Sequence, residues 1–354
     1  MRCYTWLVLV VLGAVLSACR QENNLILKNQ DRVVVYDNKK SSYENGMQYG
    51  KRYAKEIQAS TKRWTEFMES HTGKSIKRLK TMVEQRSNLI AAINKYTPNV
   101  LLEINGIAIG AGVDPDVLLL FNIGEEIYHL TNYDFQSCSN VAAVVSEGVT
   151  MVYNQDLPQF LHNESGPVLL QKEDALLFAF PGSVGISGFN KNFAVSCNSL
   201  PGVKGNGDGL PLSFVLNKIL EMSSIQEATN FIEKVHLPIP QNLMFVDGTQ
   251  LFNLEVSEKG FTTILPQNGF CAHTNYSLTS NQWMDHPNTN KCNRMKFLLE
   301  NISKTKALQT EKIHSLFTND PINNEETYLS WHTTYNASGL IEARFYDDIL
   351  YQSN

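Results

Sequence analysis

The pattern of apolar residues changes once along this chain, close to Asp134. Before that point, apolar side chains such as Tyr49, Tyr53 and Ile57 recur at a spacing of four, as one face of a helix requires. After it, short runs of β-favouring residues are separated by Gly, Asn and Pro, which is typical of strands joined by turns. The sequence therefore predicts an α+β protein in which a mostly helical segment precedes a strand-rich body.

The strand-rich body is expected to contain two packed sheets with helices outside, because helical patterns are embedded among the strands. A helix over 224–235 opens with Ser224 and Glu227, the spacing of a capping box. The other helices expected in the body are 211–222 and 293–299. The expected strands are 140–146, 149–153, 168–171, 176–180, 193–197, 242–246, 251–256, 262–265 and 270–275, with a closing hairpin over 328–334 and 339–346.

The N-terminus has the features of a targeting segment. Its apolar run, 6–18, is shorter than the ~20 residues that a helix needs to span a bilayer. Small residues then precede Cys19, as in a bacterial lipoprotein signal, although an ordinary secretory peptide with a chance cysteine is the alternative. We expect a signal peptide over 1–19, lipidation of Cys19, a polar tether over 20–40, and anchoring in the bacterial cell envelope, facing the periplasm or the cell surface.

Composition excludes several classes of function. The net charge is −5, and 18% of the residues are charged, with no basic stripe that would indicate nucleic-acid binding. No second apolar span points to a membrane channel, and no Cys-x-x-Cys pair points to a metal site. We expect neither a metal nor a cofactor. Whether Cys197, Cys271 and Cys292 are oxidised is left open by their spacing.

Cys138 lies where the helical pattern gives way to the strands, directly before the apolar run 141–145. A cysteine there is ordinarily a buried core residue. At the start of a new chain it would instead be a nucleophile whose own α-amine, with a reference pKa of ~7.7–8.0, takes the thiol proton. Asp156 is the candidate to hold that amine, and Asn198 and Asn242 are candidates to stabilise the oxyanion.

Each of these residues also has an ordinary structural explanation. Asp156 precedes Leu157-Pro158 and could shape a turn, as could Asn198 shortly before Pro201. Arg294, at an expected helix start, is by itself typical of a solvated surface charge. Only their order along the chain favours a shared function.

That order is carried by a series of short motifs. They are Tyr43-Glu44-Asn45-Gly46-Met47-Gln48-Tyr49-Gly50, Glu103-Ile104-Asn105-Gly106-Ile107-Ala108-Ile109-Gly110, Cys138-Ser139, Asn154-Gln155-Asp156, Gly188-Phe189-Asn190, Asp247-Gly248 and His273-Thr274-Asn275. Together they resemble the autoproteolytic acyltransferases and amidohydrolases related to acyl-CoA:6-aminopenicillanic acid acyltransferase, which are N-terminal nucleophile (Ntn) hydrolases. The resemblance extends over most of the chain, from Ser42 to about Tyr346.

The resemblance implies an αββα four-layer sandwich and self-cleavage between Ser137 and Cys138. The helical pro-segment, 41–137, would stay bound as the smaller chain, and 138–354 would be the catalytic chain. In this family the reaction is acyl transfer from a linear amide through a cysteine thioester, so a small acyl amide is the expected partner.

By the same resemblance, Cys138 would be the nucleophile, Asp156 would bind its amine, and Asn198 and Asn242 would form the oxyanion hole. Arg294 would lie near the nucleophile, and His273 would be structural. Two positions depart from the family pattern: Ser137 stands where glycine is common, and Tyr276 stands where the family has histidine.

Two rival interpretations remain. A papain-like hydrolase would pair Cys138 with a histidine, but such enzymes usually place the cysteine at a helix start, whereas Cys138 precedes a strand. A surface lipoprotein could also keep the fold and bind a ligand without cleavage, which the presence of Ser137 leaves possible.

Overall fold

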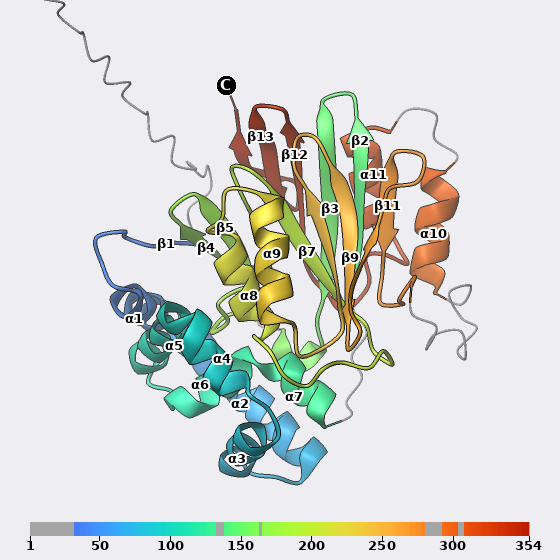
Figure 1. Ribbon diagram of the computed structural model, residues 1–354. Coiled ribbons are helices and arrows are strands. Elements are labelled where there is room, and N and C mark those ends of the chain that lie inside the picture. The colour runs from blue at the N-terminus through green and yellow to red at the C-terminus, as the bar shows by residue number, and fades with distance from the viewer. Residues whose placement is uncertain (1–31, 132–137, 163–164, 280–291, 304–307, 354) are drawn as a thin grey trace, which may run out of the picture.

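The computed structural model describes residues 32–131, 138–162, 165–279, 292–303 and 308–353 (Figure 1). Its strands form two sheets. The first, of eight strands, has the order β1-β4-β5-β6-β7-β8-β9-β10, and the second, of six, has the order β11-β2-β3-β12-β13-β14. Within the described residues, no helix is both long enough and apolar enough to span a membrane.

Among the described residues, seven helices precede Cys138, and they lie together at one end of the sandwich (Figure 1). Their bounds are α1 Ser42–Arg52, α2 Ala54–Thr72, α3 Ile76–Arg86, α4 Leu89–Tyr96, α5 Pro98–Ala111, α6 Pro115–Asn122 and α7 Gly124–Leu130. Asp114 caps α6 by accepting a hydrogen bond from the backbone N–H of Asp116, and Pro115 follows at the first helical position.

The strands of the first sheet are β1 Val33–Val35, β4 Val168–Lys172, β5 Ala175–Ala179, β6 Ser187–Asn190, β7 Ala194–Ser199, β8 Gln241–Val246, β9 Leu251–Ser257 and β10 Gly260–Ile264. Those of the second are β2 Ser139–Val145, β3 Gly148–Asp156, β11 Phe270–His273, β12 Thr327–Asn336, β13 Gly339–Phe345 and β14 Asp348–Gln352. A short 3-10 turn, η1, spans Gln159–Leu161. The helices of the body are α8 Leu212–Ile219, α9 Ile225–Val235, α10 Asn293–Ile302 and α11 Thr310–Phe317.

The two sheets face each other, and helices cover their outer faces. Across the interior, Trp331 of β12 stacks on Phe178 of β5 with ring centroids 5.1 Å apart. On the far side of the second sheet, Val141 belongs to a separate core with residues of α10 and α11, including Met295 and Phe317. Because neighbouring strand residues point to opposite faces, one strand supplies both cores.

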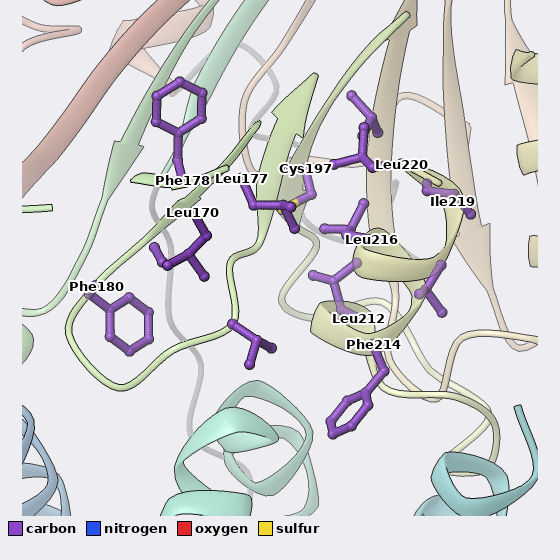
Figure 2. Close-up of a cluster of buried hydrophobic side chains, with 14 of the residues drawn as sticks. Leu170, Leu177, Phe178, Phe180, Cys197, Leu212, Phe214, Leu216, Ile219 and Leu220 are labelled. Carbon is purple, nitrogen blue, oxygen red and sulfur yellow. The ribbon is translucent and has the colours of Figure 1, made fainter. Parts of the chain in front are cut away.

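The outer face of the first sheet is covered in the same way. Figure 2 shows a buried cluster in which Leu177 and Cys197 of the sheet lie beside apolar side chains of α8 and the turn that ends it. The described elements thus form four layers, helix, sheet, sheet and helix, and the predicted αββα sandwich is confirmed.

Four glycines explain the closest helix contact, between α1 and α5. A Cβ atom on Gly106 would fall well inside contact distance of the Tyr43 carbonyl oxygen, and Gly46, Gly50 and Gly110 would meet backbone oxygens in the same way. Only glycine lets the two backbones approach this closely. The glycine spacing of the two sequence motifs is therefore a packing requirement of the segment that precedes Cys138.

Every predicted strand is present, with ends that differ by at most three residues, whereas β1, β6, β14 and helix α11 were not predicted from the sequence. The tether expected over 20–40 is wrong in its last part, because Val33–Val35 pair in parallel with β4. Such short elements are specified by their partners and not by a local pattern. The expected signal peptide and the lipidation site, Cys19, lie outside the described residues.

Candidate active site

Cys138 directly precedes β2, and its backbone is strained. Its φ is +147°, in a region that favours glycine and is sparsely populated by other residues. The side chain is buried, with 6% of the residue exposed. Its partner at the expected cleavage point, Ser137, lies outside the described residues.

The Cys138 thiol is held by a hydroxyl group. Its Sγ lies 3.1 Å from the Tyr153 hydroxyl, which also lies 3.0 Å from the Cys197 carbonyl oxygen. Because a carbonyl oxygen only accepts, the Tyr153 hydroxyl donates to Cys197, and the thiol of Cys138 donates to Tyr153. Burial, followed by the charge of Asp156, raises the pKa of the Cys138 thiol well above its usual range. In the intact chain the sulfur is therefore a protonated thiol.

Asp156 and Arg294 form a buried ion pair beside this cysteine. Arg294 Nη1 lies 3.5 Å from Asp156 Oδ2, and Asp156 also accepts a 2.7 Å hydrogen bond from the Thr327 hydroxyl. Burial raises the pKa of Asp156 even though Arg294 and Thr327 act to lower it. Asp156 is the last residue of β3, and it pairs with Thr327 of β12, so the turn considered for it from the sequence is wrong.

Arg294, in the first turn of α10, links the ion pair to the cysteine. It donates hydrogen bonds to the Cys138 carbonyl oxygen at 2.6 Å, to the Ser139 hydroxyl at 2.9 Å and to the Asn275 side-chain oxygen at 2.8 Å. Its side chain is only 14% exposed, so the solvated surface charge considered from the sequence is wrong.

Three asparagines meet on the inner side of the sandwich. Asn198 Oδ1 accepts from Asn140 Nδ2 at 2.6 Å and from Asn242 Nδ2 at 3.1 Å, and Asn198 and Asn242 pair directly across β7 and β8. Asn140 lies two positions after Cys138, on the same face of β2. The buried Asn198 Nδ2 has no hydrogen-bond partner among the described residues, so it is free to donate.

Glu255 organises the loop that carries Asn275. Its carboxylate accepts hydrogen bonds from the Ser277 hydroxyl and from both the N–H and the hydroxyl of Thr279, and it contacts His273 Nε2 at 2.7 Å. Burial alone would raise the pKa of Glu255, but these partners lower it to about 2. His273 also contacts the Thr274 carbonyl oxygen through Nδ1, so the bonds to its ring fix a loop.

The described cysteines, Cys138, Cys197, Cys271 and Cys292, are all free and buried. Cys197 donates to the Ile186 carbonyl oxygen at 3.1 Å, and Cys292 caps α10. Within the described ranges, no group of three or more His, Cys, Asp or Glu residues could hold a metal ion.

The structure thus brings Cys138, Asp156 and Arg294 together and places Asn198 and Asn242 in the adjoining amide cluster. Four residues of this site have no role predicted from the sequence: Tyr153, Asn140, Asn275 and Glu125. Tyr153 lies on β3, directly across from Asn140 of β2. Glu125 of α7 offered no signal in the sequence, because its burial depends on Gln241 of β8, whose side chain donates to it at 2.9 Å.

Comparisons with known proteins give a likeness among solved structures. No family model matches the chain, and no curated protein matches it. Among solved structures, it is similar to the Caenorhabditis elegans ortholog of N-acylethanolamine-hydrolyzing acid amidase, with 13% sequence identity and a TM-score of 0.44. The match covers 56% of this chain and 92% of that one.

Proposed function

We propose that the chain is a self-cleaving N-terminal-cysteine hydrolase that acts on linear, non-peptide amide bonds through a thioester on Cys138. The observation that carries the proposal is the convergence of Arg294 on the Cys138 carbonyl oxygen and on Asp156. A buried cysteine of the core needs neither an ion pair at its backbone nor a strained φ.

Cleavage between Ser137 and Cys138 would free the α-amine that the mechanism requires. The amine would take the thiol proton, and Asp156 would hold the resulting ammonium group. The thiolate sulfur would attack the amide carbon, and the nitrogen would leave as an amine that carries the transferred proton. Water would then hydrolyse the thioester, which releases a carboxylic acid and restores the thiol.

The oxyanion formed in each step needs fixed donors where the charge develops, and one such donor contributes about 3–4 kcal/mol. Asn198 Nδ2 is buried and unpaired within the described residues, and Asn242 is its direct cross-strand neighbour. We assign the oxyanion hole to these two amides, with Asn140 fixing the orientation of Asn198 through its 2.6 Å bond.

Self-cleavage is tested by the intact mass of the denatured protein. We expect two fragments that separate between Ser137 and Cys138, and a single uncleaved chain for Cys138→Ala. Cys197→Ala is the matched control and should still cleave, because Cys197 is also buried and bonds to Tyr153 through its backbone carbonyl oxygen, which alanine keeps. A single intact mass for the parent would overturn the autocatalytic mechanism and favour a lipoprotein that binds a ligand without cleavage.

We further propose that Cys19 is lipidated and that the lipid anchors the enzyme in the cell envelope. Acyl-CoA is a cytoplasmic donor, so hydrolysis is the expected reaction there, and acyl transfer that depends on coenzyme A is not. Each CH₂ group of the lipid that enters the bilayer contributes ~0.8 kcal/mol. Partitioning of the protein into detergent, compared with a Cys19→Ser variant, tests the anchor.

A further inference from the structure

The hydroxyl group of Tyr153 contacts both the candidate nucleophile and a backbone carbonyl oxygen in the described part of the chain. It lies 3.1 Å from Cys138 Sγ and donates a 3.0 Å hydrogen bond to the Cys197 carbonyl oxygen. A hydroxyl group carries a single hydrogen, although its oxygen can accept at the same time. While Cys138 is a thiol, it supplies the hydrogen of its own contact, so one hydroxyl group serves both neighbours.

The position of this hydroxyl group is fixed by the packing of its ring. Tyr153 is fully buried between the two sheets, and its ring centroid lies 5.7 Å from that of Trp331. On β3 it pairs with Asn140 of β2 on one side and with Trp331 of β12 on the other. The hydroxyl hydrogen can therefore rotate, while the oxygen stays beside the sulfur.

Loss of the thiol proton changes this arrangement. A thiolate has no hydrogen and can only accept, so its contact with Tyr153 needs the hydroxyl hydrogen. A hydrogen bond to a charged acceptor is roughly twice as strong as one between neutral groups. Once the thiolate has formed, the sulfur of Cys138 therefore holds this hydrogen more strongly than the Cys197 carbonyl oxygen does.

The surroundings of the sulfur oppose its ionisation. Burial and then the charge of Asp156 raise the pKa of the Cys138 thiol, and Glu125 of α7 acts in the same direction. Arg294 of α10 donates to the backbone carbonyl oxygen of Cys138. The Tyr153 hydroxyl and the backbone N–H of Asp156 lower the pKa of the thiol. The hydroxyl group is therefore a side-chain donor that favours the thiolate at this site.

Tyr153 is not the base that removes the thiol proton. Burial, followed by the charge of Cys138, raises the pKa of its phenol well above the usual range, so the hydroxyl keeps its hydrogen near neutral pH. Burial also raises the pKa of Cys197, which stays a neutral thiol beside it. The Tyr153 side chain can therefore act on the sulfur only through a hydrogen bond.

We propose that Tyr153 is a catalytic residue whose hydroxyl hydrogen turns from the Cys197 carbonyl oxygen to the sulfur of Cys138 when the thiolate forms. The thiol proton goes to the α-amine, and no covalent bond of Tyr153 breaks. When the sulfur is bound in the thioester it is a weak acceptor, so the hydrogen returns to the carbonyl oxygen. The inference rests on the proposed amidase function, because it assigns a residue to the nucleophile of that reaction.

The test is the alkylation rate of Cys138 by iodoacetamide, followed by peptide mass from about pH 6 to about pH 10. Tyr153→Phe keeps the ring and removes the hydroxyl group. We expect the apparent pKa of Cys138 to rise by about 1–2, and the rate near pH 7 to fall about ten- to a hundredfold, because a hydrogen bond to a charged group is lost. An unchanged apparent pKa would overturn the inference, even if altered access slowed alkylation equally at every pH.

Tyr335→Phe is the matched control. Tyr335 is also fully buried, and its hydroxyl donates a 2.7 Å hydrogen bond to a backbone carbonyl oxygen, that of Asn190. Each variant loses one buried hydrogen bond, but only Tyr153→Phe should raise the apparent pKa of Cys138. The same rise in both variants would overturn the assignment, because a general loosening of the interior would then explain it.

A second measurement uses the parent protein and does not depend on the folding of a Tyr153 variant. The difference infrared spectrum between the parent and Cys138→Ala isolates the S–H stretch of Cys138, because the other thiols cancel. At about pH 5, where the thiol is protonated, we expect a band at lower frequency than that of a free alkyl thiol. Such a band marks a thiol that donates a hydrogen bond, whereas the frequency of a free thiol would overturn the inference.

Kinetics separate this role from substrate binding. Tyr153→Phe should lower kcat by the same factor as the alkylation rate and leave KM unchanged, because the hydroxyl group acts on the sulfur. A higher KM with parent-like kcat would overturn the catalytic role. Alkylation and spectroscopy need neither cleavage nor turnover. Failure of the proposed function would therefore be seen separately, as an intact parent chain without turnover.

Discussion

Arg294 donates a 2.6 Å hydrogen bond to the carbonyl oxygen of Cys138, which lies 156 positions earlier in the chain. The same guanidinium group lies 3.5 Å from Asp156 and bonds to Asn275. One side chain of α10 therefore fixes the backbone of the candidate nucleophile relative to the carboxylate assigned to its amine.

Replacement of Arg294 tests this arrangement. Arg294→Lys keeps a charge but loses the planar fork that reaches two oxygens together. We expect kcat to fall about 10²-fold, because misplacement of reacting groups by about 1 Å has a cost of that size. Steady-state kinetics and intact mass measure the effect, and Lys296→Ala, on the exposed side of α10, is the control. Parent-like kcat and self-cleavage in Arg294→Lys would contradict the positioning role.

The unpaired amide of Asn198 gives a second prediction. Asn198→Asp keeps the oxygen that accepts from Asn140 and Asn242 but removes the Nδ2 donor. We expect kcat to fall about 10²–10³-fold, the effect of losing one oxyanion donor. Asn230→Ala, at an exposed position, is the control. A KM increase with unchanged kcat would instead assign Asn198 to ground-state binding.

Local sequence patterns predict some features of this site and miss others. The position of Cys138 at the change from helices to strands was sufficient to single it out. The strand predicted to end at Tyr153 continues to Asp156, because β12 pairs with its last residues. That partner lies 171 positions away from Asp156, and no local pattern encodes it.

Burial of charged residues was the least predictable feature. Glu125 follows Gly124 in a helix and has the local sequence of an ordinary first-turn acid. In the folded protein its carboxylate accepts a hydrogen bond from the side chain of Gln241, which lies 116 positions later. Glu103, by contrast, was noted as part of a motif, but its bonds to Tyr36 and Lys172 join three segments that are far apart in the sequence. Such contacts follow from the tertiary fold, which periodicity does not specify.

The glycine contact between α1 and α5 gives a prediction about stability. A Cβ on Gly106 would meet the backbone oxygen of Tyr43, which cannot move aside as a flexible side chain would. We expect Gly106→Ala to lower the free energy of unfolding by about 3 kcal/mol, the upper part of the range for overpacking. Urea unfolding measures the change.

Gly73→Ala provides the contrast for this prediction. Gly73 has a φ of +63° and nothing within 4 Å of an added Cβ, so the substitution adds backbone strain without a steric clash. Its expected cost is about 1 kcal/mol. If Gly106→Ala were no more destabilising than Gly73→Ala, the helices would be able to separate, and the packing explanation for the motif would fail.

Glu255 predicts a dependence of stability on acid. Its pKa is lowered from 4.5 to about 2 in the folded protein, so its contribution is complete above pH 4.5 and is lost as the pH falls toward 2. Glu255→Gln should lower Tm near neutral pH, because an amide nitrogen cannot accept from the N–H groups of Leu278 and Thr279. The Tm values of the parent and the variant should converge as the pH falls through this range.

Thermal unfolding monitored between neutral pH and about pH 2 follows this convergence. Glu258→Gln is the matched control, because Glu258 lies on the turn between β9, the strand of Glu255, and β10, and its Tm should follow that of the parent at every pH. A constant difference in Tm between Glu255→Gln and the parent at every pH would mean that Glu255 stabilises the protein by its packing and not by its negative charge. Convergence would instead establish that its charge holds the loop of Asn275, and with it the side chain that positions Arg294.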